Sequence, residues 1–195
     1  MRVVFWLVTC IWVVFFSFWL ILGLFSKRAS RDVPWRRRAW TARLVILVAV
    51  LAFARHVRHA GSGSAASIRH TLSLHPGIGW QCAGVGLVLI GFGFALWARL
   101  HLGRNWGMPM SLRQGHELVT SGPYAHVRHP IYSGIMLATI GSVLAGGLVW
   151  LLPVVVCFVY FLISARTEEA MMLEQFPDAY PAYRRRTKML IPFVL

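Results

Sequence analysis

Two long apolar stretches in the first half of the chain have the length of membrane-spanning helices. Val3–Phe25 is interrupted only by Thr9 and Ser17, and Ile78–Ala98 contains no charged residue. A helix of about 20 apolar residues crosses the hydrocarbon core of a bilayer, which is about 30 Å thick. The first stretch is longer than the apolar core of a signal peptide, about 7–15 residues. We therefore expect it to be a retained span.

A weaker apolar stretch lies between these two, at Ala39–Val57. Its uninterrupted apolar part, residues 44–54, is short for a crossing. Arg43 and Arg55 flank that part, and long basic side chains at helix ends can extend to the membrane interfaces. We therefore interpret this stretch as a second span.

The last apolar stretch, Ile131–Ser164, is too long for a single crossing. As one helix its 34 residues would extend about 51 Å at about 1.5 Å per residue. Gly146-Gly147 lies at its middle and predicts a turn. The stretch is therefore interpreted as a helical hairpin of two spans. The expected fold is all-α, a polytopic membrane protein of five transmembrane helices with a C-terminal helical hairpin.

Composition and charge agree with this topology. Hydrophobic residues make up 57% of the chain and charged residues 13%, against about 25% charged residues in soluble domains. The net charge is +14, and 16 of the 20 Lys and Arg residues fall in the first loop, the third loop and the tail. Basic residues concentrate on the cytoplasmic side of membrane proteins. The amino terminus is thus predicted outside and the carboxyl terminus in the cytoplasm, and no nucleic-acid partner is needed to explain the charge.

Cysteine and histidine spacing gives no sign of a metal centre. Cys10, Cys82 and Cys157 lie far apart in apolar stretches and form no disulfide or metal-binding framework. His126 and His129 have the spacing of a metal-binding pair, but no third ligand accompanies them at a diagnostic distance. No metal is therefore expected.

The segment before the hairpin, residues 116–134, has the sequence HELVTSGPYAHVRHPIYSG. Gly122-Pro123 predicts a turn, and Pro130 suits the first turn of a helix. Tyr124, Arg128 and His129 would then lie at a helix entrance, where free backbone N–H groups bind anions. The alternative is a juxtamembrane loop with interfacial aromatic and basic residues.

The segment after the hairpin carries Glu168 and Glu169, followed by Phe176, Tyr180, Tyr183 and the basic run Arg184–Arg186. The two acids are expected just past the fifth span, in or near the last helical turn. Carboxylates at a helix C-terminus oppose the macrodipole, so a cationic ligand would explain them. The alternative is a solvated charge pair beside Arg166.

Together the two segments resemble the isoprenylcysteine carboxyl methyltransferase and phospholipid methyltransferase family of membrane enzymes. The family pattern is a His before Leu-Val-x-x-Gly-x-Tyr, then Arg-His-Pro-x-Tyr-x-Gly, then Glu-Glu and a Phe/Tyr/Tyr tail ending in basic residues. All of these occur here in that order, over roughly residues 100–192. Pro177 departs from the pattern, since the family usually has Gly after the Phe.

The resemblance implies methyl transfer from S-adenosylmethionine in a cytoplasmic cofactor pocket at the membrane face. The catalytic half (99–195) would follow an N-terminal half of three spans (1–98). By analogy, the cofactor would be held by His116, Leu118, Tyr124, His129 and Glu168. Tyr132 and Ser133 would line the methyl passage. Arg128, Glu169 and Arg186 would lie nearer the acceptor.

The acceptor is expected to be lipophilic, a small molecule or a lipid-anchored group that enters from the membrane. A carboxylate acceptor needs a cation to orient it, whereas an amine must first lose a proton to a base such as Glu169 or His129. The tail arginines favour an anion, although membrane lipids would also attract them. Two other functions stay open: an NADPH-dependent membrane reductase of the sterol-reductase type, and a non-catalytic lipid-binding protein.

Overall fold

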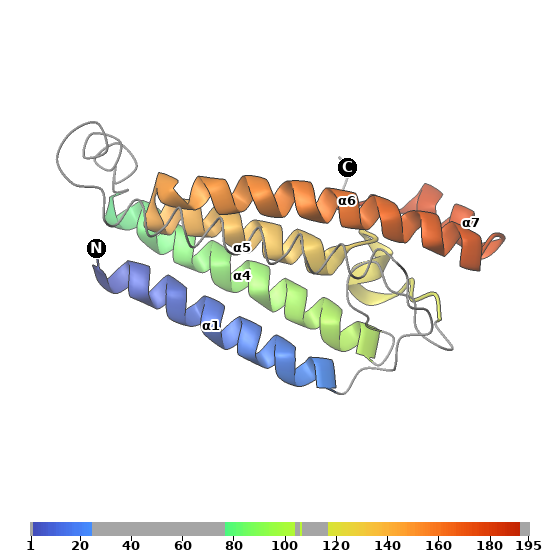
Figure 1. Cartoon of the computed structure of the whole chain (residues 1–195), viewed down its shortest axis with the longest axis horizontal. Coiled ribbons are helices and arrows are strands. Elements are labelled where there is room, and N and C mark those ends of the chain that lie inside the picture. The colour runs from blue at the N-terminus through green and yellow to red at the C-terminus, as the bar shows by residue number, and fades with distance from the viewer. Residues whose placement is uncertain (1, 25–76, 104–105, 107–116, 192–195) are drawn as a thin grey trace.

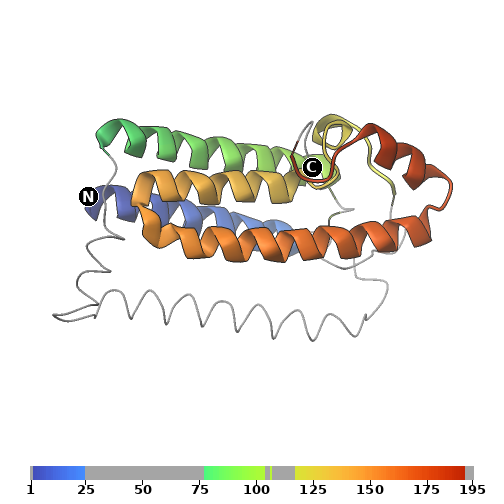
Figure 2. The same cartoon turned by 90° about the horizontal axis from the view of Figure 1, so that it is seen from above.

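The computed structural model describes residues 2–24, 77–103, 106 and 117–191. These residues form five α-helices: α1 (Arg2–Leu24), α4 (Ile78–Leu102), α5 (Pro130–Gly146), α6 (Leu151–Gln175) and α7 (Ala179–Arg186). The four long helices lie side by side, and α7 lies at one end of the bundle (Figures 1 and 2). The predicted all-α class is confirmed for this part of the chain. The predicted span Ala39–Val57 lies outside the described residues.

Helices α4 and α5 form the most extensive contact of the bundle, and glycines allow their backbones to approach closely. A Cβ placed on Gly91 would lie 2.5 Å from the carbonyl oxygen of Gly134 and 2.7 Å from the amide nitrogen of Ala138. Gly84 and Gly141 meet in the same way one heptad away. Small residues at helix interfaces are typical of membrane bundles, in which van der Waals contact drives association.

Helix α1 packs against both α4 and α5. The ring of Phe15 stacks on that of Phe92 in α4, with centroids 4.0 Å apart. The indole Nε1 of Trp12 donates a hydrogen bond to Ser142 Oγ in α5, at 3.1 Å. The first apolar stretch is therefore part of the bundle rather than a separate segment.

The predicted hairpin is confirmed, with its turn at the predicted glycines. Helix α5 ends at Gly146, and Gly147 has φ +89°, in the left-handed region that favours glycine. A short 3₁₀ turn, η3 (Leu148–Trp150), leads directly into α6. Among the described residues, α4 alone has the length and hydropathy of a complete crossing, and the apolar helical stretches Trp6–Trp19 and Pro130–Gly146 are shorter.

The position predicted for Glu168 and Glu169 within their helix is wrong. Helix α6 does not end near Ser164 but continues to Gln175, so the two acids lie well inside it. The backbone hydrogen bonding of a helix continues into polar sequence when the helix has another surface to pack against. The macrodipole argument for a cationic ligand therefore no longer applies, and the role of these acids has to be inferred from their contacts.

Candidate active site

A tight turn against the end of α4 holds Tyr124. The turn is the 3₁₀ helix η2 (Gly122–Ala125), as predicted from Gly122-Pro123, and Gly122 has φ +58°. The imidazole of His101, from the last turn of α4, lies over this glycine, 2.7 Å from where a Cβ would be. His101 Nε2 also hydrogen-bonds Ser121 Oγ at 2.9 Å, and its ring stacks on Tyr124. Only glycine satisfies both the backbone angle and the space.

The tail of the chain pairs with the residues that lead into α5. Val127 and Lys188 form an isolated parallel bridge. The backbone N–H groups of Arg128 and His129 donate to the carbonyl oxygens of Lys188 and Met189, at 2.8 and 3.1 Å. The predicted free N–H groups at this helix entrance are therefore not free at residues 128 and 129. The prediction failed because the chain's own tail supplies the acceptors that a bound anion would otherwise provide.

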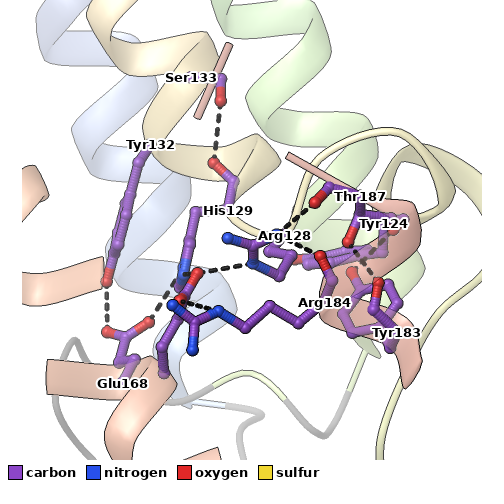
Figure 3. Close-up of polar contacts among 10 residues, drawn as sticks. Tyr124, Arg128, His129, Tyr132, Ser133, Glu168, Tyr183, Arg184 and Thr187 are labelled. Atoms are coloured by element: carbon purple, nitrogen blue, oxygen red, sulfur yellow. Dashed lines mark hydrogen bonds and ion pairs between the residues drawn. The ribbon is translucent and has the colours of Figure 1, made fainter. Parts of the chain in front are cut away.

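Five charged side chains from three segments meet beside this pairing (Figure 3). Arg128 Nε donates to Glu169 Oε1 at 2.6 Å, and Arg184 Nε lies 3.4 Å from Glu169 Oε2. His129 lies between the two acids, with Nδ1 3.4 Å from Glu168 Oε2 and Nε2 3.8 Å from Glu169 Oε1. The segments before and after the hairpin thus come together, as the sequence predicted. We refer to these five residues as the charged cluster.

Aromatic rings connect the charged cluster to the interface between α5 and α6. The Tyr132 hydroxyl donates to Glu168 Oε1 at 2.5 Å. The Tyr132 ring stacks on that of His129, with centroids 5.4 Å apart, and on that of Phe161, with centroids 4.5 Å apart. The orientation of His129 and Glu168 is therefore fixed by packing as well as by charge.

Burial and pairing shift the proton affinity of two members of the cluster in opposite directions. Burial alone would lower the pKa of His129, but the two neighbouring carboxylates, Glu168 and Glu169, outweigh burial and raise the pKa. Burial alone would raise the pKa of Glu169, but His129 and Arg128 outweigh it and lower the pKa. At neutral pH the cluster therefore favours an ionised Glu169 beside a His129 that binds its second proton more tightly than usual.

Three buried tyrosines near the charged cluster keep their phenol protons at neutral pH. Burial raises the pKa of Tyr124 and of Tyr180, and it raises the pKa of Tyr183 to about 12. The Tyr183 hydroxyl donates to the carbonyl oxygen of Tyr124 at 2.7 Å, which ties α7 to the η2 turn. These tyrosines are hydrogen-bond donors and packing surfaces rather than bases.

The other predicted site residues differ in their surroundings. His116 lies outside the described residues, and Leu118 is half-buried next to that boundary. The Ser133 hydroxyl contacts the carbonyl oxygens of His129 and Leu190, so it holds the tail to α5. Arg186 is exposed on α7, and within the described residues its side chain makes no contact with the charged cluster.

Sequence reasoning did not single out Arg184 or His101. Arg184 was one of three consecutive arginines that differ in no visible way, and only the helical phase of α7 distinguishes them. The signal for His101 was present in its position two residues after Arg99, at the end of an apolar stretch. A histidine at that point falls in the last helical turn and faces the loop that follows.

One buried nitrogen of the cluster has no hydrogen bond. His129 Nε2 is buried and has no hydrogen-bond partner within the described part of the chain. The oxygen of Glu169 at 3.8 Å is near enough for an ion pair but too far for a hydrogen bond. Because unsatisfied buried groups are rare in folded proteins, this N–H is suited to an acceptor atom of a ligand.

Comparison with known proteins places the chain in a family. A protein-S-isoprenylcysteine O-methyltransferase of Schizosaccharomyces pombe is 31% identical over 119 residues, covering 59% of this chain and 50% of that protein. The cobalt-zinc-cadmium resistance protein CzcN of Cupriavidus metallidurans is 30% identical over 125 residues, covering 58% and 53%. The chain thus spans about half the length of these relatives.

A solved structure and a family model extend this comparison. The structure of a eukaryotic intramembrane Ras methyltransferase, isoprenylcysteine carboxyl methyltransferase, matches with a TM-score of 0.57 and 23% identity, over 79% of this chain and 53% of that one. This likeness supports the fold. The family model described as phospholipid methyltransferase matches residues 80–179, just over half of the chain, and includes the charged cluster except Arg184. The chain therefore belongs to the phospholipid methyltransferase family.

Proposed function

We propose that this protein is a membrane methyltransferase that transfers the methyl group of S-adenosylmethionine to the carboxylate of a lipophilic acceptor. The observation that carries the proposal is the meeting of Arg128 and His129 with Glu168 and Glu169 in one cluster. Family membership supplies the reaction class, and the cluster supplies the groups for the cofactor and the acceptor.

The residues of the cluster fit the cofactor's chemistry. S-adenosylmethionine supplies a methyl group on a positively charged sulfur and also carries an ammonium, a carboxylate and ribose hydroxyls. The Glu168 carboxylate, whose side chain is 20% exposed, suits a cation or hydroxyl groups. The unsatisfied His129 Nε2 suits an anionic oxygen. Tyr124 and Tyr132 offer aromatic faces beside them, and such faces attract cations.

A carboxylate acceptor fits the cluster better than an amine does. A carboxylate oxygen forms its bond to the methyl carbon while the carbon–sulfur bond breaks and leaves its electron pair on sulfur, so no proton moves. An amine must first lose a proton to a base. Glu169 is a poor base because Arg128 and Arg184 hold its two oxygens and because its pKa is lowered. His129, with its raised pKa, is protonated more readily than an ordinary histidine.

Large apolar side chains on the outside of the bundle support a membrane location and a lipophilic acceptor. Trp80, Ile90 and Trp97 on α4 are more than half exposed, and α1 and α6 carry further exposed Trp, Val and Ile side chains. Soluble proteins rarely expose so many large apolar side chains. We infer that the bundle is embedded in a bilayer, with the charged cluster at its cytoplasmic face, and that the acceptor's apolar part lies in the lipid.

The test is cofactor binding and methyl transfer by the purified protein in lipid nanodiscs. Calorimetry should detect binding of S-adenosylmethionine, and labelled methyl should pass to a prenylated cysteine with a free carboxylate but not to phosphatidylethanolamine. Glu168→Gln should weaken cofactor binding, while Glu174→Gln, a change at an exposed acid of the same helix, should not. Binding of NADPH instead of the methyl donor, or methylation of the amine alone, would refute the proposal.

A further inference from the structure

The two arginines of the charged cluster differ in their contacts and in their exposure, and this difference identifies the one that is available to a substrate. The Arg128 side chain is 8% exposed and is held by several contacts. Its Nε donates to Glu169, and its Nη1 donates to the carbonyl oxygens of Thr187 and Arg184 at the end of α7. A ligand that drew Arg128 away would release both the buried acid and the tail. Arg128 is therefore a structural cation.

Arg184 is held much more loosely at the same acid. Its Nε lies 3.4 Å from Glu169 Oε2, and its side chain is 51% exposed whereas that of Glu169 is 5% exposed. Within the described residues, Glu169 is the one partner of this guanidinium. Partly solvated ion pairs contribute little to stability. Arg184 thus reaches from the solvated surface to the buried carboxylates and can leave at little cost.

Glu169 would remain paired if Arg184 moved. Its Oε1 accepts the 2.6 Å hydrogen bond from Arg128 and lies 3.8 Å from His129 Nε2. The loss of Arg184 therefore leaves no unpaired buried charge, which would otherwise carry a heavy penalty. A new carboxylate could take the place of Glu169 on the Arg184 guanidinium, whose planar fork accommodates two carboxylate oxygens.

The neighbouring arginines do not have this position. Arg185 and Arg186 follow on α7, and each residue of an α-helix turns about 100° from the one before it. Both are exposed, and neither contacts the charged cluster within the part of the chain that the structure describes. The basic run of the tail is thus divided by helical phase into one residue at the site and two on the surface.

We propose that Arg184 is the specificity-determining residue for the acceptor, exchanging its contact with Glu169 for a contact with the acceptor's carboxylate. This inference rests on the proposed function. It assigns the anion-binding role in the tail to Arg184, and it makes Glu169 the group that keeps the guanidinium in place before the acceptor arrives.

The experiment compares Arg184→Gln with Arg185→Gln, a matched change one residue along α7. With a prenylated cysteine as acceptor, Arg184→Gln should raise KM about tenfold or more, as expected for loss of a charge-assisted hydrogen bond. KM of Arg185→Gln should stay within about twofold of the wild type. Calorimetric affinity for S-adenosylmethionine should be unchanged in both variants, which also shows that each is folded.

A neutral competitor distinguishes loss of carboxylate recognition from a general loss of acceptor binding. The amide of the same prenylated cysteine lacks the carboxylate, so its inhibition constant should be the same for wild type and Arg184→Gln. Arg184→Lys, which keeps the charge but not the fork, should give an intermediate KM and serves if the Gln variant does not fold. Equal KM values for the position 184 and 185 variants would overturn the inference alone. Absence of cofactor binding by the wild type would overturn the proposed function instead.

Discussion

The close contact between α4 and α5 predicts that a single added methyl group, at Gly91, destabilises the protein. In Gly91→Ala the new Cβ would lie 2.5 Å from the carbonyl oxygen of Gly134 and 2.7 Å from the amide nitrogen of Ala138. Ordinary van der Waals contact at such a position begins at about 3.4 Å. The atoms in the way belong to the backbone, so no side chain can rotate to make room. The two helices must separate locally by about 1 Å.

The expected cost follows from two opposing effects. Overpacking of a close contact typically costs about 1–3 kcal/mol, and a rigid backbone neighbour places this site toward the upper end. Alanine is the better helix former by about 1 kcal/mol. The net expectation is a loss of about 1–2 kcal/mol in the free energy of unfolding. For a protein of this size, that corresponds to a fall in Tm of about 2–8 °C.

The assay is thermal unfolding in detergent, with Gly93→Ala as the matched control. Nothing lies within 4 Å of a Cβ at Gly93, two residues along the same helix. The control should gain helix propensity without a clash, so its Tm should equal or exceed that of the wild type. The reasoning about backbone contact would be refuted if Gly91→Ala were as stable as Gly93→Ala.

Three further predictions concern the site. Because the pKa of His129 is raised in the folded protein, its contribution to stability is complete below about pH 6.5 and is lost as pH rises through the folded pKa. Because the pKa of Glu169 is lowered, its contribution is complete above about pH 4.5 and is lost as pH falls through the folded pKa. Tm measured against pH should therefore fall on both sides of a maximum between these values, and His129→Gln should flatten the alkaline side. Tyr183→Phe removes the hydrogen bond to the carbonyl of Tyr124 and should cost about 1 kcal/mol, seen as a lower Tm with an unchanged fold by circular dichroism. Gly122→Ala places a Cβ against the His101 imidazole at a residue with φ +58°. The affinity for S-adenosylmethionine, measured by calorimetry, should fall at least tenfold. Wild-type affinity in this variant would show that the turn is unimportant.

Much of the architecture was readable from apolar run lengths. The hairpin followed from a stretch too long for one crossing with Gly146-Gly147 at its middle, because glycine is the residue that permits the left-handed turn there. The end of α6 was not readable in the same way. An apolar stretch shows which part of a helix contacts lipid or the core. The helix itself extends as far as its backbone hydrogen bonds continue, here to Gln175.

The site was predicted in part. Arg128, His129, Glu168 and Glu169 were identified through the family pattern, and the structure brings them into contact. The pairing of the tail with residues 127–129 could not be predicted, because it joins backbone groups and leaves no side-chain pattern. It changes the interpretation of the helix entrance, since the N–H groups that were expected to bind an anion already have partners.

The pairing of residues 127–129 with the tail also sets an order of assembly. Proteins emerge from the ribosome amino terminus first, and residues 187–190 follow the whole hairpin in the chain. The pairing can therefore form only after the whole hairpin has been synthesised. A nonsense mutation or proteolytic cut just before Lys188 would leave the described long helices intact and yet, under the proposed function, should abolish methyl transfer. Expression level or correct insertion alone is thus a poor guide to function for such truncated forms.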